Sequence, residues 1–187
     1  MAPSRSIRPR PALDAKRLEE LGLRYVGRYA TSRAKLVAYL ARKVRERGWS
    51  ELREPDLEAL ANRFCELGYV DDAAYALAKS QALSNRGYGK RRLDEKLRLA
   101  GIAEAEGAAA REHADAHALE SALRFAQRRR IGPFGSGDDD PRQRQKAIAA
   151  MARAGHSFAL ARIIASWPRD VEIDPGEIAD RARLVEM

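Results

Sequence analysis

The sequence contains one amphipathic helix pattern that recurs three times and ends each time at a glycine. The three copies are Leu36-x3-Leu40-x3-Val44-x3-Gly48, Leu93-x3-Leu97-x3-Gly101 and Ala147-x3-Met151-x3-Gly155. A spacing of four residues places the apolar side chains on one face of an α-helix, and glycine readily adopts the left-handed conformation that ends a helix. A chain patterned in this way is expected to be a tandem helical repeat.

Six further segments with helical periodicity lie around these copies. They span residues 13–29, 55–67, 73–84, 102–113, 119–130 and 157–167. Pro55 fits the first position of a helix, Asp71 or Asp72 suits the cap of the helix that follows, and Gly132 to Pro141 has the composition of a mobile loop. The nine helices form three sets of three, and because each small set buries little core, we expect neighbouring sets to pack together.

The expected fold is all-α, with three tandem three-helix repeats in an elongated, curved helical array. Residues 13–68, 69–115 and 116–168 form the three repeats. Residues 1–12, with three prolines and three arginines, are expected to be a disordered basic arm, and residues 169–187 an acidic tail with a short helix. Composition agrees with the helical class, since 35 alanines stand against 15 residues of Val, Ile and Thr.

The chain carries a net charge of +8, with 28 Arg and 7 Lys. Residues 169–187 have a net charge of −3, so the preceding part carries +11. Such asymmetry favours polyanions or acidic protein surfaces as partners. The single cysteine, Cys65, is expected to pack in a core and fits a reducing compartment. The sequence has neither a membrane-spanning apolar stretch nor a signal peptide, so we expect a monomeric cytoplasmic protein without membrane contact.

The patterns that are typical of catalytic or metal sites are incomplete. His113 and His117 have the spacing of zinc-protease ligands, but an alanine stands where the catalytic glutamate would be. Gly87-Tyr88-Gly89-Lys90 lacks the earlier glycine and the preceding strand of a phosphate loop, and Asp138-Asp139-Asp140 lacks the alternation of a calcium loop. His156 is expected to make an apolar contact after its helix. We therefore expect no enzymatic activity, no metal and no cofactor.

Basic residues are the remaining functional candidates, and they gather in two stretches. Residues 24–47 contain eight Lys or Arg and one acid, and residues 79–98 contain seven and two acids. From these stretches we select eight candidate binding residues: Arg33, Lys35, Arg42, Lys43, Arg86, Lys90, Arg91 and Arg92.

Cations near the start of a repeat helix oppose the helix dipole, which favours an anionic partner at residues 86–92. A solvated basic face without a partner is the alternative. The run Arg128-Arg129-Arg130 is different, because cations at a helix C-terminus stabilise the dipole by themselves.

Several stretches resemble one known family. Tyr69-Val70-Asp71-Asp72-x2-Tyr75-Ala76 and Asn85-Arg86-Gly87-Tyr88-Gly89-Lys90-Arg91-Arg92-Leu93-x3-Leu97-x3-Gly101-Ile102 are similar to the RecX family, regulators of the RecA recombinase. Tyr29-Ala30-Thr31-Ser32-Arg33-x2-Leu36-x2-Tyr39-Leu40 resembles the first repeat of that family, and the resemblance spans about residues 13–167. The chain departs from the family pattern at His156, where the family has a large hydrophobic residue, often Phe. It also departs at Tyr88, often Pro in the family, and in its acidic tail.

The resemblance implies a bacterial helical-repeat protein that acts in homologous recombination, DNA repair and the SOS response. Such a protein lies along the groove of the RecA filament on single-stranded DNA, and it inhibits strand exchange, ATP hydrolysis and co-protease activity. A second function stays open, that of a direct DNA-binding module of the helix-turn-helix type, which also pairs basic helices across glycine-containing turns. That alternative predicts salt-dependent binding to DNA without any recombinase.

Overall fold

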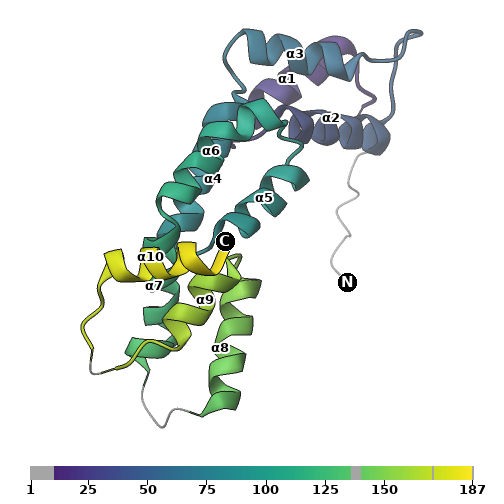
Figure 1. The fold of residues 1–187 in the computed structure, drawn as a ribbon. Helices are drawn as coiled ribbons and strands as arrows, with labels where there is room; N and C mark the ends of the chain where they lie inside the picture. Colours follow the sequence, from purple (N-terminus) through teal and green to yellow (C-terminus); the bar gives the residue numbers. More distant parts are fainter. Residues whose placement is uncertain (1–10, 136–139, 170, 187) are drawn as a thin grey trace, which may run out of the picture. The chain divides into compact units, whose positions relative to one another are not determined.

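The computed structural model describes residues 11–135, 140–169 and 171–186, and the chain divides into two compact units, residues 1–72 and 73–187. Within the described residues, the regular structure consists of ten α-helices and one short 3-10 helix (Figure 1). The predicted all-α class is therefore confirmed, and the nine expected helices occur within a few residues of their predicted ends. The arrangement as three copies of one repeat stays a prediction.

The first unit is built from three helices around one core. They are α1 (Ala15–Val26), α2 (Arg33–Arg47) and α3 (Leu57–Glu66). Their buried apolar residues are Leu13, Leu18, Leu36, Leu40, Ala61, Phe64 and Val70. Each helix starts at a polar cap, since Asp14, Ser32 and Asp56 accept hydrogen bonds from backbone N–H groups of the following turn. The expectation that Pro55 opens α3 is wrong, because Asp56 caps a helix that begins at Leu57.

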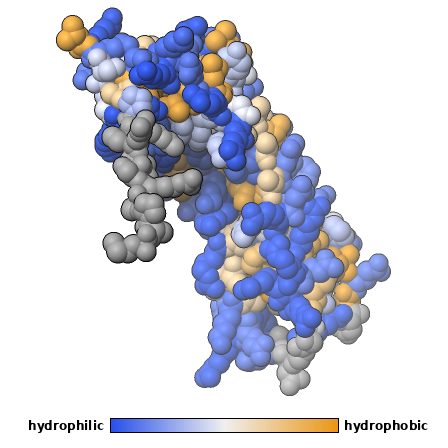
Figure 2. Space-filling view, turned by 180° about the vertical axis from the view of Figure 1, so that it is seen from behind, coloured by the Kyte–Doolittle hydropathy of each residue, from blue (hydrophilic) through white to orange (hydrophobic). Residues whose placement is uncertain are grey.

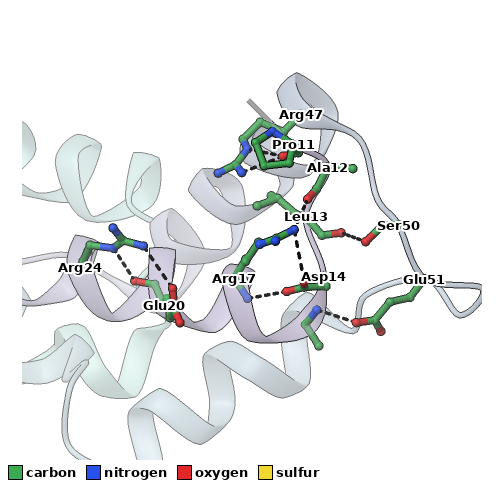
Figure 3. Close-up of polar contacts among 11 residues, drawn as sticks. Pro11, Ala12, Leu13, Asp14, Arg17, Glu20, Arg24, Arg47, Ser50 and Glu51 are labelled. Atoms are coloured by element: carbon green, nitrogen blue, oxygen red, sulfur yellow. Dashed lines mark hydrogen bonds and ion pairs between the residues drawn. The ribbon is translucent and has the colours of Figure 1, made fainter. Parts of the chain in front are cut away.

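The beginning of the described chain is tied to the end of α2 (Figure 3). Arg47 donates from Nε and Nη2 to the Pro11 carbonyl at 3.1 and 2.7 Å. The N–H of Leu13 donates to the Gly48 carbonyl at 2.9 Å, and the Leu13 carbonyl accepts from the N–H of Ser50 at 2.9 Å. These bonds hold Leu13 fully buried in the first core. Residues 1–10, the larger part of the expected basic arm, lie outside the described residues.

The second unit holds the remaining helices. They are α4 (Asp72–Asn85), α5 (Lys90–Leu99), α6 (Glu104–Ala116), α7 (Ala118–Arg129), the 3-10 helix η1 (Gly132–Phe134), α8 (Pro141–Arg153), α9 (Phe158–Ala165) and α10 (Pro175–Glu186). One core of buried apolar residues lies among α4, α5 and α6. A larger core lies among α7, α8, α9 and α10. Both cores are filled mainly by Ala, Leu and Ile, as expected from an alanine-rich chain.

The segment expected to be a mobile loop is ordered at both of its ends. Gly132 begins η1, and Pro141 is the first residue of α8, where the carboxylate of Asp140 accepts from the N–H of Arg142 at 2.9 Å. Proline is suited to this first helical position, because its missing N–H would have no partner there. Residues 136–139 of the expected loop, including Asp138 and Asp139, lie outside the described residues.

The acidic tail carries the expected helix, α10, and this helix packs on α9. Ile178 is fully buried in the larger core, and Ala182 is buried beside it. Asp174 accepts from the N–H of Gly176 at 2.8 Å, and the guanidinium of Arg181 lies 5.2 Å from the ring centre of Trp167. The tail helix is therefore part of the larger core.

The three repeat glycines all have the positive φ that the pattern predicts, although Gly48, with ψ 165°, lies outside the left-handed helical region. Gly48, Gly101 and Gly155 have φ of +79°, +67° and +97°. Gly155 has a second role, because it meets Gly89 at the start of α5. The N–H of Gly89 donates to the Ala154 carbonyl at 3.0 Å, and the N–H of Arg91 donates to the Gly155 carbonyl at 3.2 Å. The end of α8 thereby caps the start of α5, which has no side-chain cap.

We predict that Gly89→Ala destabilises the second unit by about 1–3 kcal/mol, the usual cost of overpacking. An added Cβ at Gly89 would lie 2.3 Å from the Gly155 carbonyl oxygen, and backbone atoms cannot move aside easily. The backbone of Gly89, with φ −86° and ψ 173°, suits alanine, so the cost is steric alone. Urea unfolding followed by circular dichroism measures it.

The matched control is Gly107→Ala, the same substitution inside α6. Its Cβ would meet the end of the flexible Arg111 side chain, and alanine favours the helix by about 1 kcal/mol over glycine. We expect this variant to be as stable as the wild type or more so. Equal stability of the two variants would contradict a tight contact between α5 and α8.

Candidate polyanion-binding surface

Hydrophilic residues cover most of the face drawn in Figure 2, so exposed charge alone does not mark a site. The partners of each predicted basic residue are more informative. Arg33 donates from Nη2 to Glu58 Oε2 at 2.5 Å and from Nε to Asn62 Oδ1 at 2.6 Å. Its backbone N–H donates to Asp72 Oδ1 at 2.8 Å. The guanidinium of Arg33 therefore joins α2 to α3 and serves the fold of the first unit.

The other candidates of the first unit lie along α2. Arg42 and Lys43 share the carboxylate of Glu46, at 3.6 Å from Arg42 Nε and 2.6 Å from Lys43 Nζ. The hydrogen bond from Lys43 lowers the pKa of Glu46. Both cations also lie within 6 Å of the Tyr39 ring centre, and Lys35 is exposed one turn into the helix. This face of α2 keeps an excess of positive charge.

The remaining candidates lie in the second unit, at the start of α5. Lys90 Nζ pairs with Asp115 Oδ2 at 2.5 Å, and Arg92 Nη1 pairs with Glu95 Oε2 at 2.6 Å. Arg91 is exposed, and no ion pair joins it to another described residue. Intramolecular carboxylates, together with the α8 carbonyls, thus compensate much of the unfavourable charge at this helix start.

The glycines and tyrosine of the family-like motif serve packing. Gly87 lies against α7, where an added Cβ would come within 2.9 Å of the Phe125 N atom. His156 is 2% exposed, donates from Nε2 to the Gly87 carbonyl at 3.2 Å and lies 5.5 Å from the Phe125 ring. Burial lowers the pKa of His156 to about 4. The expectation that His156 makes an apolar contact is confirmed, with one added hydrogen bond.

The residues considered for metal or thiol chemistry have structural surroundings. The rings of His113 and His117 stack 4.1 Å apart, and His113 Nδ1 lies 3.1 Å from Ser80 Oγ. In the part of the chain that the structure describes, no three metal-ligating side chains come together. Cys65 packs beside the first core, and burial raises the pKa of its thiol.

A concave surface in the second unit gathers arginines from four parts of the chain. It consists of two adjoining depressions that share Arg128 and Arg129. We call this surface the arginine cleft. Its arginines are Arg86, Arg128, Arg129, Arg130, Arg144, Arg153 and Arg169. Asp140 is the one acidic residue among the described residues that line it.

Hydrogen bonds and ring contacts fix part of this cleft. Arg128 Nη1 donates to the Arg86 carbonyl at 2.5 Å, which joins the end of α4 to α7. The guanidinium of Arg86 lies 5.5 Å from the Tyr88 ring centre. Arg129 and Arg153 are exposed, and neither forms an ion pair with another described residue. Their positive charge faces solvent without a carboxylate from the described part of the second unit.

Of these arginines, the sequence alone predicts only Arg86 as a binding residue. The helix dipole accounts for residues 128–130, and no pattern in the sequence singles out Arg144, Arg153 or Arg169. One feature of the sequence does point to this cleft. Arg130 occupies the position directly after its helix, where the repeat helices have glycine. The other arginines come together only through the packing of α7, α8 and α9, which no spacing in the sequence reveals.

Comparison with curated proteins finds relatives over most of the chain. A protein of Myxococcus xanthus named "Regulatory protein RecX" is 35% identical over 165 residues, covering 78% of this chain and 82% of the relative. Proteins of the same name from Thermobifida fusca and Agrobacterium fabrum are 31% and 29% identical, covering 78% and 71% of this chain and 75% and 73% of each relative. No family model matches the chain. None of the helices in the described residues has the length and apolar character needed to cross a membrane.

We predict that the second unit loses about 3 kcal/mol of stability as pH falls from 6.5 to 4, through His156. The unfolded chain binds a proton below its ordinary pKa of 6.5, whereas the folded chain keeps the ring neutral down to about 4. This stability is fully present above pH 6.5. Unfolding experiments in urea across this range measure it.

The variant His156→Phe removes this group and should flatten the pH dependence by that amount. The matched variant His117→Phe keeps His156 and should retain the wild-type slope. If His156→Phe shows the same pH dependence as the wild type, the ring is not held neutral in the folded protein.

Proposed function

The chain belongs to the RecX family of regulatory proteins, and on this premise we propose that it binds the RecA recombinase filament formed on single-stranded DNA. In this function it lowers strand exchange, ATP hydrolysis and co-protease activity. The observation that carries the proposal is the similarity to relatives named "Regulatory protein RecX" over 78% of the chain. The absence of a metal cluster in the described residues and the packing roles of the motif glycines fit a binding protein.

The regulation follows from differential binding. A ligand that binds one state of a filament more tightly than another shifts the population toward that state, by no more than the difference in affinity. The chain needs no chemistry of its own to do this. Its positive charge favours association with phosphate and with acidic protein surfaces, and it raises the association rate at low salt.

The residues best placed to contact the filament are the exposed cations that do not hold the fold together. In the second unit this description fits Arg91, at the start of α5. In the first unit it fits Arg42, which is exposed on the face of α2 beside the half-buried Lys43. Arg33, Lys90 and Arg92 are weaker candidates than the sequence suggested, because each pairs with a carboxylate of its own, whereas Arg42 and Lys43 share the single carboxylate of Glu46.

The central experiment is co-sedimentation with RecA filaments on single-stranded DNA, compared with naked DNA of the same sequence across a salt series. The proposal expects saturable binding to the filament and a fall in RecA ATP hydrolysis at the same concentrations. Equal binding to naked duplex DNA without an effect on ATP hydrolysis would favour the direct DNA-binding alternative.

We predict that Arg91→Glu weakens filament binding about fivefold, since an exposed ion pair contributes up to about 1 kcal/mol. The control is Arg162→Glu, which reverses the charge of another exposed arginine, on α9 and outside the candidate residues. Circular dichroism should show native helicity for both variants. The contribution of Arg91 is refuted if both variants bind and inhibit like the wild type.

A further inference from the structure

We propose that His113 and His117 bind a divalent first-row transition-metal ion, such as Zn²⁺ or Ni²⁺, at the end of α6. The two side chains are four residues apart, which places them on one face of the helix. The proposal goes beyond the regulatory function, because it requires neither a recombinase nor DNA. It departs from the sequence-based expectation that the chain binds no metal.

The missing glutamate of the zinc-protease pattern excludes catalysis but not a metal. In that pattern the two histidines are ligands, whereas the glutamate is the general base. Ala114 stands at the position of the glutamate, so this chain lacks the base and keeps both ligands. The sequence therefore rules out protease chemistry here and leaves a site that binds an ion without a reaction.

The hydrogen bonds around His113 fix the tautomer of its ring. Ser80 is buried, and its Oγ donates its single proton to the Ala110 carbonyl at 2.7 Å. This oxygen can therefore only accept from His113 Nδ1, which lies 3.1 Å away and carries the ring proton. The other ring nitrogen, Nε2, keeps its lone pair. Burial and the neighbouring His117 lower the pKa of His113, which favours this neutral form.

The His117 ring is arranged in the same way. Its Nδ1 lies 2.8 Å from the His113 carbonyl, which can only accept, so Nδ1 donates and Nε2 again keeps its lone pair. A metal-binding histidine usually donates its second ring N–H to an acceptor such as a backbone carbonyl, which orients the ring and makes its lone pair more basic. Both histidines meet this condition through contacts within the second unit.

The spacing of the two rings suits a shared ion. Their centres lie 4.1 Å apart, and their planes differ by 16°. A bond from Zn²⁺ to a histidine nitrogen is about 2.0–2.1 Å long, so a small rotation of the rings brings both Nε2 atoms within reach of one ion. Both side chains are half-buried, so solvent reaches them. Stacking alone would explain the ring contact, but it leaves both lone pairs without a partner among the described residues.

The ligands identify the class of ion and how firmly it is held. Imidazole suits Zn²⁺, Ni²⁺ and Cu²⁺, whereas Mg²⁺ and Ca²⁺ prefer oxygen ligands. Structural zinc sites have four protein ligands and catalytic sites usually three, but no third metal-ligating side chain joins this pair in the described part of the chain. The carboxylate of Asp115 pairs with Lys90 instead. Water therefore completes the coordination, and the ion exchanges with the solvent.

Binding of the ion fixes the junction between α6 and α7. His117 lies between the two helices, with φ −104° and ψ 16°. An ion bound to His113 and His117 joins the two ends of the last turn of α6. The unfolded chain does not hold the two rings at this spacing, so the ion binds the folded chain more tightly and stabilises it.

Isothermal titration calorimetry of the full chain, without a histidine tag, measures binding of Ni²⁺ and Zn²⁺. We expect one ion per chain. The variant His117→Phe keeps a stacked ring but removes one ligand, so it should bind at least tenfold more weakly. Ser80→Ala keeps both ligands and removes only the acceptor that orients His113, which should weaken binding about tenfold. Wild-type affinity in His117→Phe would overturn the proposal.

The matched control moves one ligand and keeps the number of histidines. Glu112→His/His113→Ala places two histidines five residues apart, on different faces of the helix. Glu112 is exposed, and the Ser80 hydroxyl keeps its bond to the Ala110 carbonyl, so this variant should fold. We expect it to lose affinity as His117→Phe does, and unchanged affinity would exclude a site shared by two rings. Cys65→Ser should bind like the wild type, and a loss there would assign the ion to the thiol instead.

Thermal unfolding and NMR show where the ion binds. At free Ni²⁺ about a hundred times the dissociation constant, the unfolding midpoint of the second unit should rise by about 5–10 °C, and that of the control variant should not. Long-range ¹H–¹⁵N spectra should show the proton on Nδ1 in both rings and a Zn²⁺-induced shift of their Nε2 resonances. His156, which donates from Nε2, is the internal reference. An unchanged midpoint of the wild type would refute binding to the folded chain.

Discussion

The contact between the end of α8 and the start of α5 governs how the second unit is organised. Helix ends leave N–H and C=O groups without partners, and α5 begins at a glycine that offers no side-chain cap. Carbonyls of the α8 end supply the missing acceptors, and they can approach only because Gly89 and Gly155 lack side chains. The negative end of one helix dipole also meets the positive end of another. The family-like motif at residues 85–93 therefore joins the start of α5 to the end of α8.

This organisation divides the basic residues into two groups. One group holds elements together: Arg33 joins α2 to α3, Lys90 joins α5 to the end of α6, and Arg111 pairs with Asp94 at 3.0 Å. Exposed ion pairs of this kind each add little to the free energy of unfolding, but their carboxylates neutralise positive charge that could otherwise bind an anionic partner. The other group consists of exposed cations such as Arg129 and Arg153, which form no ion pair with another described residue. The net charge of the sequence does not distinguish these two groups. The distinction depends on whether the fold places an acidic residue next to each basic side chain.

Local signals in the sequence predicted the helices well, and they predicted the site only in part. Apolar spacing and closing glycines located all nine expected helices, because burial and the left-handed helix end are decided within a few residues. The sequence predicts that α3 starts at Pro55, but it starts at Leu57. Asp56 determines the start, because its side chain binds a free N–H of the first turn, and this stabilises a helix start more than the favourable φ of proline does. The cleft was missed because it joins segments that are more than forty residues apart. The partners of Lys90 and Arg92 were missed too, although Glu95 lies only three residues from Arg92.

The group formed by α7, α8 and α9 has features that offset one another. It has Arg130 in the left-handed conformation at the end of α7, with φ +53°, and a cluster of cations, both of which lower stability. It also has the largest core, to which the tail helix adds Ile178 and Ala182. The side chain of Trp167 connects these features, because it is buried, lines the cleft and contacts Arg181 of α10. The acidic tail further lowers the net charge of the unit, which reduces repulsion over distances of about a Debye length, roughly 10 Å. The tail helix thus adds buried apolar surface to the core that carries the arginine cleft, which offsets part of the cost of gathering its cations.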